Sequence, residues 1–324
     1  MRARCLTALG LVLAAGSAAA ATAGPTAWVS NERDNTVSVL DVGTMSLIDT
    51  IPVGKRPRGI VFSPDYRTLY VCASDDDTVQ VLDVASRKVT ANLPSGADPE
   101  FFDLDPTGRY LYIANEDDAI TTVVDTAERR VVAQIDVGVE PEGMAVSHDG
   151  RWAVTTSETT NMVHWIDTAT HEIVANTLVA QRPRYARFSA DDRLLWATSE
   201  IGGAVTVIDA ATREPVREIR FAIPGVTQDL VQPVGLRLAR DGTKAFVALG
   251  PANRVAVIDT ATFAVEKYLL VGRRVWHLDL TPDGSTLLTT NGLTNDVSVI
   301  DVASLEVIRS TPVGRMPWGV AVRP

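Results

Sequence analysis

The stretch Arg56-Pro57-Arg58-Gly59-Ile60-Val61-Phe62 joins a turn marked by proline and glycine to a short apolar run. Related stretches return along the whole chain. They begin at Asp98-Pro99, Glu140-Pro141, Arg182-Pro183, Gln232-Pro233, Arg274-Val275 and Met316-Pro317. Repetition of one turn and one strand predicts a repeat architecture, in which shared residues build the fold and variable ones carry the function.

A second landmark is a run of β-branched residues that ends in aspartate, as in residues 37–41. Its seven aspartates are Asp41, Asp83, Asp125, Asp167, Asp209, Asp259 and Asp301, spaced by 42 residues except for 50 before Asp259. Each unit holds four strand-like runs, which in the first full unit are residues 59–62, 68–73, 78–84 and 88–93. Four short strands per period, without an amphipathic helix, predict a β-propeller blade with strands A to D from the axis outward. The repeated aspartates are predicted to cap turns.

The two ends of the chain predict how the ring closes. The last unit stops after a strand A near Pro324, whereas the N-terminal part supplies strands B, C and D at residues 27–30, 36–42 and 46–52. One blade completed by both ends leaves no exposed edge between the first and last blades. We therefore expect an all-β, seven-bladed propeller with four antiparallel strands per blade, forming one domain over residues 24–324.

Residues 1–23 have the pattern of a cleaved signal peptide, with two arginines, an apolar run over 6–15 and small residues up to Ala23. The run is too short to span a membrane. We therefore expect a protein that is exported to the periplasm or secreted. We also expect it to be a monomer. Loss of the two arginines leaves 28 of the 30 basic residues against 40 acidic ones. This acidic balance argues against nucleic-acid binding. Cys72 would be the only cysteine left, which rules out an intrachain disulfide.

Several segments resemble a known group of repeat proteins. Residues 69–74 and 111–115, each followed by an apolar run ending in aspartate and a Val-Gly-x-x-Pro-x-Gly turn, resemble the YVTN-repeat β-propellers. Within that group, residues 73–77, 157–162, 199–203, 248–254 and 268–272 resemble the β-propeller proteins associated with catabolism dependent on pyrroloquinoline quinone (PQQ).

The resemblance implies a periplasmic protein that works beside quinoprotein alcohol or aldehyde oxidation, with a quinoprotein dehydrogenase or a cytochrome as partner. It implies PQQ only indirectly, through the partner enzyme. Proteins that hold this cofactor resemble eight-bladed propellers with tryptophan docking motifs and an adjacent-cysteine disulfide. This chain has seven units and one cysteine beyond residue 23. We therefore expect no cofactor of its own.

Strand A is expected to line the central channel with its second and fourth residues after the proline landmark. The second position reads Gly59, Phe101, Gly143, Tyr185, Gly235, His277 and Gly319, and the fourth reads Val61, Asp103, Ala145, Arg187, Arg237, Asp279 and Ala321. Four charges on apolar strands are expensive in a dry core. Either they fill the channel with ion pairs and water, or Arg187 and Arg237 form a site for a carboxylate.

The D-to-A and B-to-C loops share one face of a propeller and place many charges around one rim. The landmark supplies Arg56, Arg58, Asp98, Glu100, Glu140, Glu142, Arg182, Arg184, Arg274, Trp276 and Trp318, and the B-to-C loops supply Glu32, Glu116, Glu158 and Glu200. This rim is either solvated scaffolding or a surface that docks a partner or a small polar ligand. Residues 221–232 lengthen one D-to-A loop, as a tolerated insertion or as a lip over the channel.

No catalytic set or metal site emerges from the sequence. His148 and His171 fall in turns and His164 in a C strand, so that only His277 should face the channel. The leading hypothesis is a non-catalytic binding or docking protein associated with quinoprotein alcohol catabolism. One alternative is a lactonase-like hydrolase that uses Tyr185, Arg187, Arg237, His277 and Asp279. Another is a structural subunit of a periplasmic redox complex.

Overall fold

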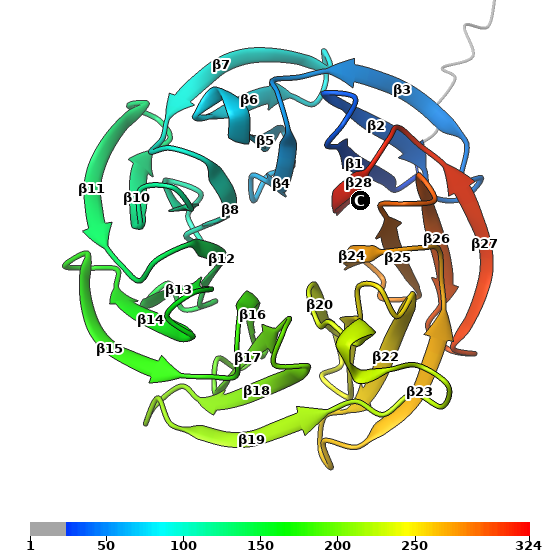
Figure 1. Ribbon diagram of the computed structural model, residues 1–324. Coiled ribbons are helices and arrows are strands. Elements are labelled where there is room, and N and C mark those ends of the chain that lie inside the picture. Colours follow the sequence, from blue (N-terminus) through cyan, green and yellow to red (C-terminus); the bar gives the residue numbers. More distant parts are fainter. Residues whose placement is uncertain (1–23) are drawn as a thin grey trace, which may run out of the picture.

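The computed structural model describes residues 24–324, and the predicted signal peptide at residues 1–23 lies outside this range. Seven four-stranded antiparallel sheets stand around a central axis as the blades of a propeller, which confirms the predicted fold (Figure 1). Strand A of each blade lies at the axis and strand D at the outer edge. The D-to-A and B-to-C loops form what we name the upper face, and the A-to-B and C-to-D turns form the lower face.

Blade 1 contains β28 (Pro317–Arg323), β1 (Thr26–Asn31), β2 (Thr36–Asp41) and β3 (Leu47–Pro52). Blade 2 contains β4 (Pro57–Phe62), β5 (Thr68–Ala73), β6 (Thr78–Asp83) and β7 (Lys88–Pro94). Blade 3 contains β8 (Pro99–Leu104), β9 (Tyr110–Asn115), β10 (Ile120–Asp125) and β11 (Arg130–Asp136). Blade 4 contains β12 (Pro141–Val146), β13 (Trp152–Ser157), β14 (Met162–Asp167) and β15 (Glu172–Leu178).

Blade 5 contains β16 (Pro183–Phe188), β17 (Leu194–Ser199), β18 (Ala204–Asp209) and β19 (Pro215–Arg220). Blade 6 contains β20 (Leu236–Leu238), β21 (Lys244–Ala248), β22 (Arg254–Asp259) and β23 (Val265–Leu270). Blade 7 contains β24 (Val275–Leu280), β25 (Thr286–Asn291), β26 (Asp296–Asp301) and β27 (Glu306–Pro312). Two short 3₁₀ turns, η1 (Ser74–Asp76) and η2 (Gln228–Leu230), lie in loops of the upper face. No helix within residues 24–324 is long and apolar enough to cross a membrane.

The blades pack through strands A, B and C, whereas strand D covers the outside. Strands B and C are buried along nearly their whole length, as in β9 and β10, while the D strand β15 alternates mainly between exposed and half-buried residues. The apolar residues at the third position of strand A, which alternation directs away from the channel, are no more than 5 % exposed: Ile60, Phe102, Met144, Ala186, Leu236, Leu278 and Val320. The hydrophobic core is therefore a series of interfaces between neighbouring sheets.

The ring closes as the chain ends predict. Strand β28 pairs with β1, with Arg323 opposite Thr26 and Pro317 opposite Asn31. All seven aspartates that end the C strands accept backbone N–H bonds in the turns that follow, which confirms their predicted role as caps. Asp41, for example, accepts from Thr44 at 2.7 Å.

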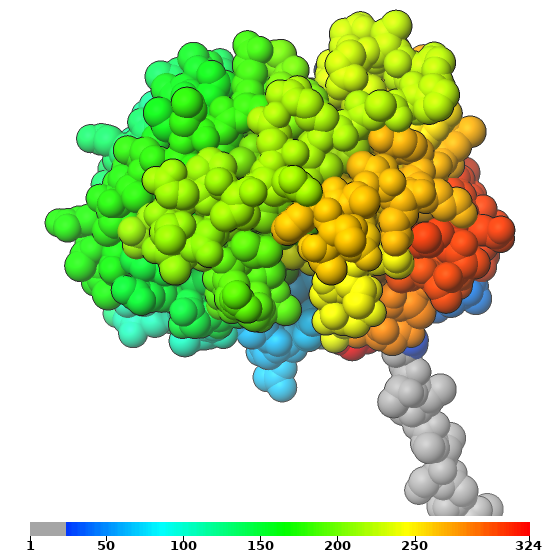
Figure 2. All heavy atoms as spheres, turned by 90° about the horizontal axis from the view of Figure 1, so that it is seen from below, coloured from blue at the N-terminus to red at the C-terminus, as the bar shows by residue number. Residues whose placement is uncertain are grey.

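The inserted segment 221–232 packs on the upper face between blades 5 and 6. Phe221 and Val231 are buried, and a Cβ at Gly203, in the B-to-C loop of blade 5, would lie 2.9 Å from Nε2 of Gln228. Figure 2 shows this segment, in yellow-green, standing above its surroundings. At its end, Gln232 Oε1 accepts from Arg274 of the upper face at 2.8 Å. The segment is thus a packed wall beside the upper end of the channel.

Candidate functional site

Glycines and aromatic rings alternate around the channel at the second position of strand A. A Cβ at Gly59, Gly143, Gly235 or Gly319 would lie 2.7 Å from a carbonyl oxygen of the next blade, so these glycines allow close approach of neighbouring backbones. Phe101, Tyr185 and His277 occupy the blades between them. Because the number of blades is odd, two glycines, Gly319 and Gly59, are neighbours. No second-position side chain therefore fills the channel beside blades 1 and 2, which leaves a gap there.

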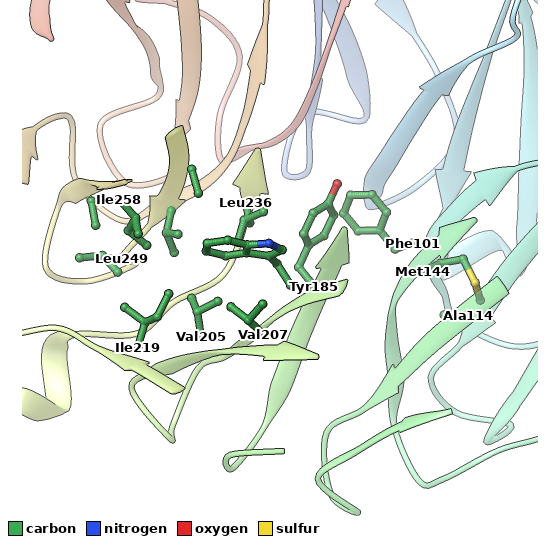
Figure 3. Packing of buried hydrophobic residues seen from close by; sticks show 14 of the residues in the cluster. Phe101, Ala114, Met144, Tyr185, Val205, Val207, Ile219, Leu236, Leu249 and Ile258 are labelled. Carbon is green, nitrogen blue, oxygen red and sulfur yellow. The ribbon is translucent and has the colours of Figure 1, made fainter. Parts of the chain in front are cut away.

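Trp318, from the residue just before Gly319, fills this gap. Its ring centroid lies 4.2 Å from that of His277 and 5.3 Å from that of Phe101. Phe101 in turn lies 5.1 Å from Tyr185, as Figure 3 shows, and 5.0 Å from His277. All four rings are buried. They form an aromatic layer that separates the upper part of the channel from the lower part.

A β-bulge explains why Trp318 faces the axis although it occupies the first position. The pairing of strands A and B shifts register in six blades, for example between Pro99 and Phe102 of β8. A bulge sets two residues of one strand against one of its partner, so simple alternation fails there. First-position residues therefore do not point away from the channel. Glu100, Glu142 and Arg184 are instead buried directly above the aromatic layer.

Most of the rim residues nominated by the sequence form two sectors of ion pairs above that layer, which together we name the upper network. Its members are Arg56, Arg58, Arg182, Arg184, Arg274, Glu32, Asp98, Glu100, Glu116, Glu142, Glu158 and Glu200. In the first sector, the carboxylate of Glu100 bridges Arg56 and Arg58, and Arg56 also donates to Asp98 at 2.5 Å. Glu100 is fully buried, which makes these charged hydrogen bonds necessary.

The second sector of the upper network is centred on Arg184. This arginine pairs with Glu142 at 2.8 Å and with Glu158, and both carboxylates are buried. Arg182 pairs with Glu158 at 2.7 Å, and Arg274 with Glu200 at 3.0 Å. These ion pairs join blades 4, 5 and 7, so the predicted rim of charges is largely internal and self-paired.

The two rim tryptophans hold arginines of the upper network by their faces. The guanidinium of Arg274 lies 4.1 Å from the ring centroid of Trp276, and that of Arg58 lies 5.4 Å from the ring of Trp318. Arg184 also approaches Trp276, at 5.9 Å. These cation–π contacts fix the arginine side chains while the carboxylates satisfy their N–H groups.

Acids outnumber arginines in the upper network, and this raises several pKa values. Burial, together with the neighbouring Glu100, raises the pKa of Glu116 to about 8. Burial and the same neighbour raise the pKa of Asp98 to about 6. Burial also raises the pKa of Glu142, although Arg184 opposes the effect. Oxygens of Asp98, Glu100 and Glu116 lie within 4.8 Å of one another, but Arg56 already occupies two of these acids, so the group is not a free metal site.

Below the aromatic layer the channel opens into a cavity of about 220 Å³ on the lower face. Its polar wall consists of Asp103, Tyr185, Arg187, Arg237 and Asp279, and its apolar wall includes Phe101 and Val61. The structure thus brings together all four charges of the fourth position. We name this space the lower cavity.

The two aspartates of the lower cavity tie neighbouring blades together. Asp103 accepts from the backbone N–H of Leu104 at 3.0 Å and from that of Val146 in the next blade at 3.0 Å. Asp279 accepts from Leu280 at 2.9 Å and from Val322 of blade 1 at 2.8 Å. Burial raises the pKa of Asp103, and the charge of Arg187 partly offsets this rise. The carboxylate oxygens of both residues are committed to the fold.

The two arginines of the lower cavity differ sharply in their partners. Arg237 donates to Asp279 at 3.0 Å and also to the Tyr185 hydroxyl and the carbonyl of Leu236. Arg187 forms no ion pair and no side-chain hydrogen bond with any residue between 24 and 324. Its guanidinium therefore meets the lower cavity with its donors free.

His277, the histidine predicted to face the channel, is part of the aromatic layer. Burial, followed by the charges of Arg237, Arg184 and Arg58, lowers its pKa well below the ordinary value. The ring is therefore neutral at physiological pH. Its Nδ1 has no hydrogen-bond partner among residues 24–324.

Sequence reasoning missed the part of the site that comes from lower-face turns. Tyr66 lines the lower cavity, and His148 and Arg240 line hollows that adjoin it. The sequence does mark these residues. The second residue of the A-to-B turn is proline in three blades, Pro64, Pro106 and Pro282, whereas His148 and Arg240 occupy this position in two others.

The fold and the channel define a class: a closed seven-bladed β-propeller whose axis is blocked by an aromatic layer. The chain belongs to the YNCE-like β-propeller family, whose model matches residues 1–323. No curated protein matches the sequence.

Solved structures of the same fold include proteins of different activities. A chain of Kuenenia stuttgartiensis hydrazine synthase is 20% identical, with a TM-score of 0.79 over 90% of this chain and 99% of that one. The dihydro-heme d1 dehydrogenase NirN is 18% identical, with a TM-score of 0.70 over 95% of this chain and 77% of that one. A protein of Bacteroides fragilis NCTC 9343, provisionally described as a 6-phosphogluconolactonase, is 15% identical, with a TM-score of 0.80 over 95% and 100%. At these identities the likeness concerns the fold.

Proposed function

We propose that this protein binds small carboxylates in the lower cavity without transforming them. The observation that carries the proposal is Arg187, which lines the cavity and forms no ion pair or side-chain hydrogen bond with residues 24–324, so that its N–H donors are free although its charge also acts on Asp103. A half-buried arginine with free donors is a ready partner for a planar carboxylate, which it engages through two parallel hydrogen bonds. The nearby acids do not compete, because Asp103 and Asp279 already accept backbone N–H bonds.

The rest of the lower cavity suits a small organic acid. Phe101 and Val61 offer apolar contact for a short carbon chain, while Tyr185 and Arg237 form a hydrogen-bonded polar pair. A volume of about 220 Å³ admits a molecule of a few carbon atoms. Substrate-sized pockets of this kind combine an apolar lining with a few polar groups that fix orientation.

The resemblance to propellers of PQQ-dependent catabolism supplies a setting for this binding. Oxidation of an aldehyde yields a carboxylic acid, so a carboxylate-binding protein in the periplasm would act on the product side of a quinoprotein dehydrogenase. We propose that the protein is exported there and that the upper face contacts the dehydrogenase or its cytochrome. The more exposed members of the upper network, Arg182 and Arg56, would make this contact.

Calorimetric titration tests the binding proposal. The protein is titrated with acetate, propionate, lactate and glycolate at constant ionic strength, and so are two variants. Arg187→Gln should lower the affinity at least tenfold, because a charged bidentate contact contributes more than about 1.4 kcal/mol. Arg130→Gln is the matched control, since Arg130 is exposed and pairs only with Glu128. Absence of binding by the wild type at millimolar ligand, or equal binding by both variants, would refute the proposal.

A lactone hydrolase is the second candidate, and one contact favours it. The Tyr185 hydroxyl, held by Arg237, lies in the wall of the lower cavity, where it can exchange a proton with a bound ligand. A panel of lactones assayed with wild type, Tyr185→Phe and His277→Ala distinguishes the candidates. Turnover that Tyr185→Phe abolishes would establish hydrolysis at this site, whereas no turnover by the wild type leaves binding alone.

A further inference from the structure

The lower-face turns of three consecutive blades differ from the others at one position. Pro64, Pro106 and Pro282 occupy the second residue of the A-to-B turn in blades 2, 3 and 7. Blades 4, 5 and 6 have His148, Ala190 and Arg240 there. These blades are also the ones that carry, or adjoin, Arg187 and Arg237 on strand A.

A second hollow lies next to the lower cavity, beside the turns that lack proline. It has a volume of about 440 Å³ and is lined by His148, Arg187, Arg237, Arg240 and the small side chain of Ala190. A third hollow, of about 190 Å³, joins Arg187 and Asp103 to His148. Arg187 lines all three spaces. The lower cavity therefore continues outward from Arg187 to the turns of blades 4 and 6.

The outer end of this path carries free basic groups. Arg240 forms no ion pair and no side-chain hydrogen bond with any residue between 24 and 324, as is also true of Arg187. The ring of His148 is held in place by Asp192, whose Oδ1 lies 2.6 Å from its Nδ1. The lining of one hollow thus includes the free guanidiniums of Arg187 and Arg240 and the oriented imidazole of His148.

Acidic neighbours of this hollow are committed elsewhere. Asp279 binds Arg237 and Val322, and Asp192 accepts from the backbone N–H of both His148 and Asp149. Asp241, beside Arg240, accepts from the backbone and side chain of Thr243. The groups along the path that are still free to form hydrogen bonds are therefore mainly donors, namely the N–H groups of Arg187 and Arg240.

We infer that the ligand is a dicarboxylate, with one carboxylate at Arg187 in the lower cavity and the second at Arg240 and His148 on the lower face. The inference rests on the proposed function and narrows it from carboxylates in general to molecules with two acidic groups joined by a short chain. Two separated arginines with free donors match two separated carboxylates, and a single carboxylate leaves one of them unused.

A chain-length series tests the inference. Wild type and variants are titrated by calorimetry with butyrate and pentanoate and with succinate, glutarate and adipate, at equal ionic strength. At least one dicarboxylate should bind about tenfold tighter than the monocarboxylates. Arg240→Gln should remove this advantage and leave monocarboxylate binding unchanged. Because Arg240 is exposed, its substitution leaves the fold intact, which circular dichroism and the unfolding midpoint verify. Arg130→Gln should change neither ligand class.

The outcomes separate the two proposals. If dicarboxylates bind no tighter than monocarboxylates, or if Arg240→Gln leaves their advantage intact, the second subsite is refuted while carboxylate binding stands. If neither class binds the wild type, both proposals fail. Arg187→Gln should weaken the binding of both monocarboxylates and dicarboxylates. If it weakened only dicarboxylate binding, Arg187 would not be the site that binds a single carboxylate, and the proposed function would be refuted.

Discussion

The backbone N–H of Arg182 donates to Oδ1 of Asn161 at 2.9 Å, and both residues have left-handed backbones, with φ of 60° and 57°. Arg182 begins the proline landmark of blade 5, and Asn161 precedes the C strand of blade 4. The same bond recurs at Arg56, Asp98, Arg274 and Met316, with Asn35, Asp77, Asn253 and Asn295 as acceptors. All of these left-handed donors except Arg274 precede proline, where such a backbone is unfavourable, so this bond from the preceding blade stabilises the landmark.

Ala119 and Gly203 lack the polar acceptor found at the other equivalent positions, and Ala119 provides the first prediction. Ala119 has a left-handed φ of 53° but no polar side chain. Glu140, which begins the landmark of the next blade and would donate the missing bond, has a φ of 57°. Ala119→Asn should add the missing bond and place a better residue in the left-handed region. We expect the free energy of unfolding to rise by about 0.5–1.5 kcal/mol, measured by urea denaturation. Asn161→Ala should lower it by a similar amount, and an unchanged midpoint in both variants would contradict the proposed role.

The second prediction concerns the buried part of the upper network. Arg184 pairs with the buried Glu142 and Glu158, so Arg184→Met leaves two carboxylates without their main partner. Removal of one member of a buried ion pair costs about 3–5 kcal/mol. Urea denaturation should show a loss of this size. Arg130→Gln, which breaks an exposed pair with Glu128, should stay within about 1 kcal/mol of the wild type. A small loss for Arg184→Met would mean that the network is hydrated rather than dry.

The third prediction follows from the raised pKa of Glu116. Its ordinary pKa is 4.5 and its pKa in the folded chain is about 8, so between these values the folded chain keeps a proton that the unfolded chain has lost. Stability from this group therefore falls as pH rises from about 4.5 to about 8 and is constant above that range. Glu116→Gln stays uncharged and lacks this dependence.

The difference between the two proteins isolates the effect. Asp98 and Glu142 also have raised pKa values, but both are present in wild type and variant. Urea midpoints measured from pH 5 to pH 9 should show Glu116→Gln becoming progressively more stable than the wild type. Parallel curves would indicate that Glu116 ionises normally.

The sequence predicted the ring, its closure and the identity of the channel charges, because these depend on period and alternation. The 42-residue spacing and the position of the chain ends were sufficient for blade count and for the β28–β1 pairing. What alternation could not predict is the bulge in strand A, which depends on pairing with strand B and turns first-position residues such as Glu100 inward. Trp318 was nominated for the rim, but its place in the aromatic layer depends on this bulge.

Partner choice within the site was also beyond the sequence. Arg187 and Arg237 occupy equivalent positions on neighbouring blades, and nothing local distinguishes them. Their difference arises across blades, because Asp279 lies one blade beyond Arg237 at the same height while Ala145 and Arg237 flank Arg187. The asymmetry that carries the proposed function therefore comes from the order of residues around the ring.

The fourth prediction tests the alternation of glycines and rings around the channel. A Cβ on Gly143 would meet the carbonyl oxygen of Arg184 at 2.7 Å and the Cα of Tyr185 at 2.8 Å. Both are backbone atoms of the next blade, so relief requires the two blades to move apart. Gly143→Ala should lower the free energy of unfolding by about 1–3 kcal/mol, as overpacking of a close-packed interior does. It should also weaken carboxylate binding, because Tyr185 lines the lower cavity.

Gly43→Ala is the matched control for this substitution. Gly43 lies in an exposed turn, and a Cβ there would meet only Asp41 Oδ1 at 3.5 Å, an ordinary contact. It should be neutral or slightly stabilising, because alanine restricts the unfolded chain more than glycine does. Equal effects of the two substitutions would show that a general property of glycine, rather than blade contact, determines stability. A loss at Gly143 alone would show that close approach of neighbouring blades holds the aromatic layer and the lower cavity in place.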